Sequence, residues 1–286
     1  MKGKMALAEI KRNPEEPHSI EEWEVQIKAT WENAPEFKVN PQKTKHVAVI
    51  CDGNRRAANE IHLKPNLGHQ AGVETIRGVA RTLRKWGVKN STFWVWSREN
   101  WKREKNDPQQ VKFVMKLAYE NLKDPNFLEE LKENQVRFTQ IGRKEKIYKL
   151  FNNKMGKIIE KLEEETKKFN SYQLNLAMDY IGLDEINRAY LKMNEDIGKG
   201  KLDPNLPKKR PKLIYNYLDT AGQPLVDLVI RTGMNIDEIP HTSDFMPLQA
   251  RFACWQFLPD FFPNLTPYTL LETIEGFEKY ERRFGR

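Results

Sequence analysis

Charged and amide side chains follow a short apolar run near residue 50 and could together bind a diphosphate and a divalent cation. The run His46–Cys51 has strand character and stops at Asp52. The polar turn that follows consists of Gly53, Asn54, Arg55 and Arg56. Arginine forks and backbone N–H groups bind phosphate oxygens, and a carboxylate oxygen is a ligand that Mg²⁺ prefers. An Asp-Gly turn after a strand is also common without any function, so this segment alone leaves both interpretations open.

Later segments also place polar side chains beside the ends of predicted elements. His69 lies at the start of a helix, where the helix dipole favours an anion, and a simple capping role is the alternative. The apolar strand Ser91–Trp96 leads into a polar loop. That loop contains Ser97, Asn100, Trp101 and Arg103. Arg231 ends another strand, so each segment adds a group that suits an anionic ligand.

Strands and helices alternate over most of the chain. The predicted strands are His46–Cys51, Ser91–Trp96, Gln135–Ile141, Tyr172–Ala177 and Asp227–Arg231. The predicted helices are Ala71–Trp86, Asp107–Leu122, Lys144–Phe169, Asp184–Asp196 and a last helix that Thr266 and Pro267 open. This alternation predicts an α/β fold: a single domain with a mostly parallel central sheet flanked by helices. Ligands of such sheets bind beyond the carboxyl ends of the strands, which groups Asp52, Ser97 and Arg231 without any motif.

The ends of the alternating region are less regular. Residues 1–44 are polar and contain four prolines, so we expect an irregular N-terminal arm with one short docked helix. Residues 45–286 then form the domain. Residues 197–224 interrupt the alternation, and the cations and prolines between Lys199 and Lys212 indicate an exposed basic insertion.

Composition narrows the class of protein. No run of about 18 apolar residues is present, so we expect no membrane-spanning helix. The two cysteines and the absence of a signal-peptide pattern favour a reducing, cytoplasmic location. The net charge of +8 fits a lysine-rich surface, with anionic substrates or peripheral association with an anionic membrane face as alternatives. No nucleic-acid-binding motif is found, so we expect no nucleic-acid partner.

Five segments, in order, resemble the cis-prenyltransferases, the undecaprenyl diphosphate synthase family. They are Asp52–Arg56, Gly68–Glu74, Ser97–Arg103, Leu174–Tyr180 and Asp227–Gly233. The third is the most specific, because the string Glu-Asn-Trp-Lys-Arg is rare. The resemblance covers about residues 45–285 and implies condensation of an allylic prenyl diphosphate with isopentenyl diphosphate. It also implies Mg²⁺ as cofactor and assembly as a homodimer.

The resemblance also implies a role for each matching residue. Asp52 corresponds to the aspartate that holds Mg²⁺ on a diphosphate, and Asn100 and Arg103 shape the reaction centre. Those three are the predicted catalytic residues. The predicted substrate-binding residues are Gly53, Asn54, Arg55, Arg56, His69, Ser97, Trp101, Arg231, His241 and Ser243. An apolar tunnel beside the sheet would hold the growing chain.

The chain departs from the family pattern mainly near its second substrate. His241 stands where a diphosphate-binding arginine is expected, and Cys254 where the partner subunit supplies a glutamate that works on Mg²⁺. A thiolate is a poor ligand for Mg²⁺. Three interpretations stay open: an active enzyme with a rearranged site, a variant enzyme that makes branched or cyclic products, and a non-catalytic subunit of a heteromer. A soft-metal site made of Cys51 and Cys254 is a minor hypothesis.

Overall fold

The computed structural model describes residues 16–235 and 237–281. Its central layer is a six-stranded sheet in the order β3-β4-β2-β1-β5-β6, and all neighbouring strands are parallel. The strands are β1 (His46–Ile50), β2 (Asn90–Ser97), β3 (Val136–Ile141), β4 (Tyr172–Tyr180), β5 (Leu228–Arg231) and β6 (Cys254–Phe257). The predicted α/β class with its parallel sheet is therefore confirmed.

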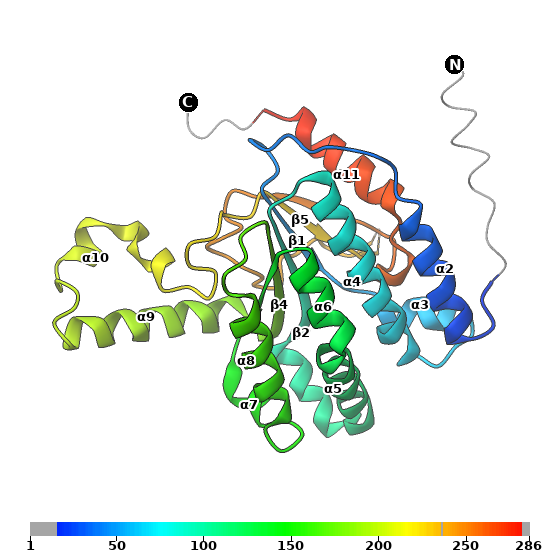
Figure 1. The fold of residues 1–286 in the computed structure, drawn as a ribbon, viewed down its shortest axis with the longest axis horizontal. Helices are drawn as coiled ribbons and strands as arrows, with labels where there is room; N and C mark the ends of the chain where they lie inside the picture. Colours follow the sequence, from blue (N-terminus) through cyan, green and yellow to red (C-terminus); the bar gives the residue numbers. More distant parts are fainter. Residues whose placement is uncertain (1–15, 236, 282–286) are drawn as a thin grey trace.

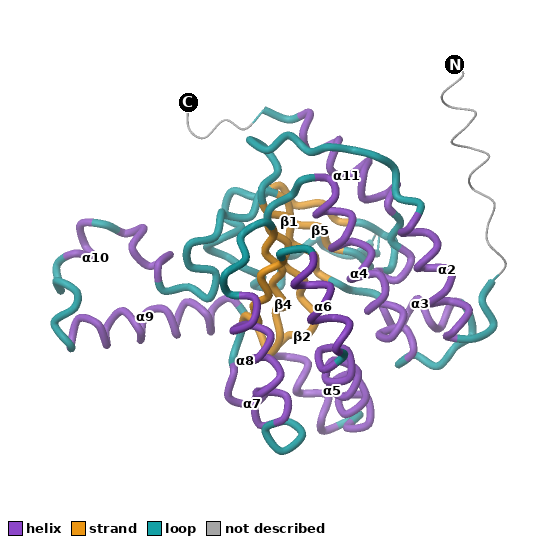
Figure 2. The backbone as a smooth tube through the Cα atoms, in the orientation of Figure 1, coloured by secondary structure: helices purple, strands orange, loops and turns teal. Residues whose placement is uncertain are grey.

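Helices surround this sheet, and Figures 1 and 2 show α4, α5, α6, α7 and α8 gathered on one side of the strands. The α-helices are α2 (Ile20–Glu32), α3 (Asn54–Glu60), α4 (Leu67–Trp86), α5 (Pro108–Lys123), α6 (Pro125–Glu133), α7 (Lys144–Lys149), α8 (Lys154–Thr166), α9 (Gly182–Gly198), α10 (Leu206–Lys209) and α11 (Pro267–Lys279). Short 3₁₀ helices occupy Arg98–Lys105, Pro211–Asn216 and Phe262–Asn264.

The central strand β1 shows why its sequence is apolar throughout. All five of its residues are buried. Val47 and Val49 belong to the large core under the helices, whereas Ala48 and Ile50 belong to a smaller core on the opposite face. Successive side chains point to opposite faces, so a parallel strand covered on both sides reads as a continuous apolar run. Its last residue therefore leads directly into the polar turn at Asp52.

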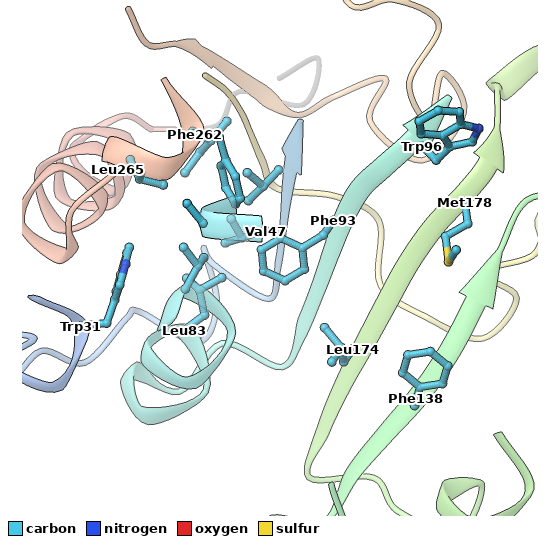
Figure 3. Packing of buried hydrophobic residues seen from close by; sticks show 14 of the residues in the cluster. Trp31, Val47, Leu83, Phe93, Trp96, Phe138, Leu174, Met178, Phe262 and Leu265 are labelled. Carbon is cyan, nitrogen blue, oxygen red and sulfur yellow. The ribbon is translucent and has the colours of Figure 1, made fainter. Parts of the chain in front are cut away.

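The helical side of the sheet forms the main core. Figure 3 shows Phe93 beside Val47, and Trp96 and Met178 toward the carboxyl ends of their strands. Helix α2 closes this core from outside through Trp31. A Cβ atom added at Gly78 of α4 would lie 2.1 Å from the Trp31 ring, so glycine is required for this close approach.

Two sequence predictions about elements are corrected, and one strand was not predicted. The single helix predicted over Lys144–Phe169 is wrong: α7 and α8 are separated where Phe151, Asn152 and Asn153 have left-handed backbone angles, which asparagine tolerates well. The helix predicted to begin at Asp184 begins at Gly182, so Asp184 lies in the first turn of α9 and does not cap it. The edge strand β6 was not predicted, because it is short and only half-buried.

The basic insertion lies on a projecting part of the molecule. In Figure 1, α9 extends away from the body and leads to α10. The cationic side chains between Lys199 and Lys212 are exposed. Residues 1–15 of the expected arm lie outside the described part of the chain. Within the described ranges, no helix is both long and apolar enough to cross a membrane.

Candidate active site

The carboxyl ends of the central strands meet at one polar pocket. Ile50 of β1 is in register with Trp94 of β2 on one side and with Arg231 of β5 on the other. The pocket beyond these ends has a volume of about 550 Å³. The predicted site residues among its lining are Asp52, Gly53, Asn54, Arg55, Arg56, His69, Ser97, Asn100, Arg103, Arg231 and Ser243. Residues from five separate segments of the sequence therefore converge, as the sheet topology requires.

Asp52 lies between two arginines. One carboxylate oxygen accepts hydrogen bonds from the Gly53 backbone at 2.6 Å and from Arg56 at 3.2 Å, and the other lies 3.4 Å from Arg231. The Asp52 backbone is tied to the side chain of Thr232, the residue just after β5, through 2.9 Å and 3.1 Å hydrogen bonds. The side chain is 41% exposed, so the carboxylate is fixed in position and still open to the pocket.

Glycines allow the segments around Asp52 to touch. Gly53 has φ of 95°, a left-handed angle that favours glycine, and a Cβ there would lie 2.6 Å from the Phe261 ring. A Cβ at Gly68 would lie 1.8 Å from the Asn54 carbonyl, and one at Gly72 would lie 2.3 Å from Asn54 Oδ1. The Gly-His-Gln-Ala-Gly segment thus lets α4 pack against the Asp52–Arg56 turn.

Cations around the pocket are only partly neutralised by protein carboxylates. Among the described residues, neither Arg55 nor Arg103 forms an ion pair. The Arg55 guanidinium donates a long hydrogen bond of 3.5 Å to the Gln110 side chain. Burial, followed by repulsion from Arg55, lowers the pKa of Arg103. Burial and then the charges of Arg103 and Arg55 lower the pKa of His69 to about 4, so this imidazole is neutral at physiological pH. Such a cluster favours an anionic ligand.

The loop after β2 is held by its own side chains. Ser97 Oγ accepts from the Asn100 backbone at 3.2 Å, and Asn100 Oδ1 accepts from the Ser97 backbone at 2.9 Å, which forms a capping box. This pair fixes the loop that carries Arg103 into the pocket. Trp101 does not line the pocket: its indole N–H donates to the buried Asp179 at 2.8 Å.

Arg231 organises the opposite side of the pocket. Its guanidinium donates to His241 Nδ1 at 3.0 Å, to the His241 carbonyl at 2.7 Å and to Ser243 Oγ at 2.9 Å. Ser243 Oγ also lies 2.8 Å from His241 Nδ1, and His241 Nε2 lies 3.5 Å from Glu238. Arg231 is 7% exposed, whereas His241 is 50% exposed and does not line the pocket itself.

An apolar cavity adjoins the same pocket. Cys51, Asn54, His69, Val95 and Trp96 line both spaces. The cavity then continues between the helical side of the sheet and helices α4, α5 and α6, and its lining is mostly apolar. Val114, Met115 and Leu117 of α5 line it, whereas Phe93 of β2 lies in the core beside it. The polar and apolar spaces thus lie side by side.

A metal could be held here only with help from a ligand. Among the described residues, no group of three or more His, Cys, Asp or Glu side chains could hold a metal. Mg²⁺ is commonly bound through one or two carboxylates together with substrate phosphate oxygens. Asp52, fixed and open to a pocket suited to phosphate, fits that role.

Cys254 lies away from the pocket of its own chain. It is in register with Leu228, whereas Phe257 is in register with Arg231, so Cys254 lies roughly 10 Å below the sheet edge. Cys51 immediately follows β1 at that edge. Within one chain the two thiols therefore do not converge, and the proposed soft-metal pair is not supported by this geometry.

Two residues near the site were not predicted from the sequence. Gln110 of α5 contacts both Arg55 and His69, at 3.5 Å in each case. Asp179, fully buried with φ of 52°, accepts hydrogen bonds from Trp101 and Arg143. The Leu174–Tyr180 match contained Asp179, but only the folded structure shows which loop it supports.

Comparisons with known proteins agree with this geometry. Residues 50–285 match the family model described as "Putative undecaprenyl diphosphate synthase". An isoprenyl transferase of Clostridium tetani is 35% identical over 241 residues, covering 84% of this chain and 89% of that protein. A geranylgeranyl-diphosphate-specific tritrans,polycis-undecaprenyl-diphosphate synthase of Pyrococcus horikoshii is 34% identical, covering 85% of this chain and 87% of that protein.

Solved structures show the same similarity. Lavandulyl diphosphate synthase from Lavandula x intermedia, in complex with dimethylallyl diphosphate, superposes with a TM-score of 0.76 and 26% identity. That comparison covers 86% of this chain and 100% of the other. A "probable undecaprenyl diphosphate synthase" from Campylobacter jejuni gives a TM-score of 0.63 at 28% identity, covering 85% and 99% of the two chains.

Proposed function

This chain belongs to the undecaprenyl diphosphate synthase family of prenyltransferases, and on this premise we propose that it condenses an allylic prenyl diphosphate with isopentenyl diphosphate. The observation that carries the proposal is that the cationic pocket and the apolar cavity adjoin and share five lining residues. Four arginines and two carboxylates line the pocket, and one of those carboxylates, Glu99, pairs with Lys102. A prenyl diphosphate has the matching shape: a multiply charged head on a hydrocarbon tail.

The allylic diphosphate would lie beside the Asp52–Arg56 turn. Asp52 would hold Mg²⁺ there, and the bound metal would neutralise diphosphate charge. Arg55, Arg56 and Arg103 would bind the diphosphate oxygens and stabilise the charge that develops as the allylic C–O bond breaks. Asn100 contributes by fixing the loop that carries Arg103.

The second substrate would bind with its diphosphate at Arg231 and Ser243. Its double bond then attacks the allylic carbon, a new C–C bond forms, and the resulting cation loses a proton. His241 offers a ring nitrogen that already accepts from Arg231, so it supplies less positive charge than the arginine expected there. We therefore infer weaker binding on this side.

We also propose that the chain acts as a homodimer joined near the edge strand β6. A parallel strand at a sheet edge leaves backbone groups unpaired, and β6 is only half-buried. Phe252, just before this strand, is 54% exposed, as large apolar side chains at an interface often are before assembly. The exposed cations of residues 199–212 suit an anionic membrane face, which we propose as a peripheral contact in the cytoplasm.

A variant coupling reaction is the second candidate. The similarity to lavandulyl diphosphate synthase favours it, together with the changed residues His241 and Cys254. In this reaction two five-carbon diphosphates would give one branched product instead of a growing linear chain. The polar pocket and the adjoining cavity would serve both reactions.

Product analysis separates the candidates. Purified protein would be incubated with isopentenyl, dimethylallyl, geranyl and farnesyl diphosphates, with and without Mg²⁺, and products identified by chromatography and mass spectrometry. Linear products that grow by five-carbon steps support elongation, whereas a single branched product supports the variant reaction. Absence of product in every mixture would contradict both and would favour a subunit that needs a partner.

A further inference from the structure

The apolar cavity follows the length of helix α4. His69 lies at the end near the polar pocket, and Gly72, Val73, Ile76 and Ala80 continue the lining along one face of this helix. Arg84 lines the cavity at its far end, roughly 22 Å along the helix axis from His69. On the sheet side the lining runs from Trp96 and Met178 down to Leu174, which Figure 3 shows near the opposite end of the strand.

Two polar bridges join the helices beside this path. Arg77 of α4 donates to Asn121 of α5 at 2.7 Å. One turn further, Arg81 donates two hydrogen bonds of 2.6 Å to the carboxylate of Glu130 on α6. We call these four residues the polar clasp. All four line the cavity, so the bridges join helices that enclose it.

The cavity is small for the path that lines it. Its volume is about 160 Å³. A cavity of roughly that size holds one benzene molecule, which has six carbons. The space thus suits about one five-carbon unit beyond the mouth, although the lining continues to Arg84. A longer chain must move α4 away from α5 and α6 or push its end against the clasp.

We propose that the polar clasp limits the length of the prenyl chain, an inference that rests on the proposed function. Arg81 is 49% exposed and Glu130 is 33% exposed, so this pair faces water as well as the cavity. A hydrocarbon end that reaches the pair would have to displace it or enter water, and both are unfavourable. The hydrogen bond between them raises the pKa of Arg81 and lowers the pKa of Glu130. Both groups are therefore charged while the pair is formed. The clasp holds the helices together and presents no apolar surface to a growing end.

The test breaks the clasp without touching the diphosphate pocket. Glu130→Gln keeps the shape of the side chain and removes its charge, and Arg81→Ala removes the bridge entirely. Lys132→Ala is the matched control, because Lys132 is on the same helix but pairs with Glu165 of α8. Thermal unfolding would verify that each variant folds, and product length would be measured with each primer.

We expect the clasp variants to shift the main product by at least one five-carbon unit, with Arg81→Ala giving the larger shift and Lys132→Ala none. If wild type makes a single branched product, the same variants should raise kcat/KM for farnesyl relative to dimethylallyl diphosphate. Unchanged product length and primer preference in folded variants would overturn the clasp, although the proposed function would stand.

A binding measurement keeps the two proposals separate if turnover fails. Calorimetric titration with farnesyl diphosphate and with dimethylallyl diphosphate, each alone, gives the affinity ratio for long and short tails. If the clasp limits chain length, the affinity for farnesyl relative to dimethylallyl diphosphate should rise in Glu130→Gln and Arg81→Ala. It should stay constant in Lys132→Ala. A constant ratio in all three variants would overturn the clasp even without product.

Discussion

The two sides of the polar pocket are built differently. In the primer flank, made of Asp52–Arg56 and His69, the Asp52–Arg56 turn packs through glycines against α4, the helix that carries His69. The Thr232 side chain also donates a hydrogen bond to the Asp52 carbonyl. The acceptor flank, made of Arg231, His241 and Ser243, depends on one guanidinium that makes three of its hydrogen bonds. His241 itself is half-exposed.

This contrast indicates where the chemistry can change. Close packing on the primer flank fixes the Asp52 carboxylate, so substitutions there disturb the backbone as well as the charge. The acceptor flank includes exposed side chains that can be exchanged with little effect on packing. Under the proposed function, the departures at His241 and Cys254 would therefore concern the second substrate. We therefore expect the allylic diphosphate to be bound in the family manner and the second reactant to decide the product.

Removing the Asp52 carboxylate should give the largest effect and should break the primer flank. Asp52→Ala loses the proposed metal ligand and leaves Arg56 and Arg231 without this partner. We expect kcat/KM to fall about 1,000-fold, comparable with the loss of a key transition-state contact. Steady-state kinetics at saturating Mg²⁺ would measure it, with the exposed Asp203→Ala as control. Turnover within tenfold of wild type would refute the metal role.

Acid should destabilise the folded protein through His69 of the primer flank. The folded chain keeps His69 neutral down to about pH 4, whereas the unfolded chain protonates it near pH 6.5. The stability that this histidine contributes is thus complete above pH 6.5 and is lost as pH falls toward 4, by about 3 kcal/mol. Urea unfolding of wild type and His69→Gln at pH 7 and pH 4.5 would measure the difference.

Other buried groups make the comparison with His69→Gln necessary. Burial also lowers the pKa of His46 to about 4, so it adds a loss of the same sign. Burial raises the pKa of Glu185, which therefore acts in the opposite sense. These contributions are shared by both proteins and cancel in the difference. Equal losses of unfolding free energy in wild type and variant would contradict the assignment to His69.

Removing Arg231 should break mainly the acceptor flank, because its contact with Asp52 at 3.4 Å is long. Arg231→Ala removes the guanidinium that holds His241 and Ser243. We expect kcat/KM for isopentenyl diphosphate to fall about 100-fold, the value of a charged hydrogen-bonding group of about 2–3 kcal/mol. The affinity for the allylic diphosphate alone should change much less. Arg137→Ala, on the exposed face of β3, is the control. Equal losses of affinity for both substrates in Arg231→Ala would contradict the distinction between the two flanks.

Replacing Cys254 with the glutamate expected from the family pattern should strengthen the acceptor side and sharpen the contrast between the two flanks. Cys254→Glu places a hard oxygen ligand at the proposed dimer edge, and we expect Mg²⁺-dependent elongation to rise about tenfold. Cys254→Ser changes the thiol without adding a carboxylate and should have no such effect. Product formation across a range of Mg²⁺ concentrations would measure it. Unchanged or lower activity would mean that this side has been rebuilt around the thiol.

The sequence was most informative where one strand end meets a polar turn. The apolar run before Asp52 and the strand before Arg231 identify two carboxyl ends, and parallel topology then brings them together. The order of five matching segments supplied the family. These features depend on local sequence and on one rule of topology, so they could be predicted without coordinates.

Features set by tertiary contact could not be predicted in this way. The edge strand β6 has no alternating pattern, since both of its faces are half-buried. The break at Phe151–Asn153 depends on backbone angles that the apolar spacing does not reveal. Trp101 fits a site residue by motif, yet its partner Asp179 lies 78 positions later in the chain. The polar clasp similarly joins three helices whose pairing only the fold determines.

The distance in sequence between Asp52 and Thr232 has a consequence for biosynthesis. Their hydrogen bond joins residues 180 positions apart. At a synthesis rate of about 5–20 residues per second, roughly 10–40 seconds pass between the emergence of the two partners. The nascent chain must therefore protect β1 and its polar turn until β5 arrives. The active site can therefore be completed only late in synthesis, and a chain truncated before residue 231 would not form it.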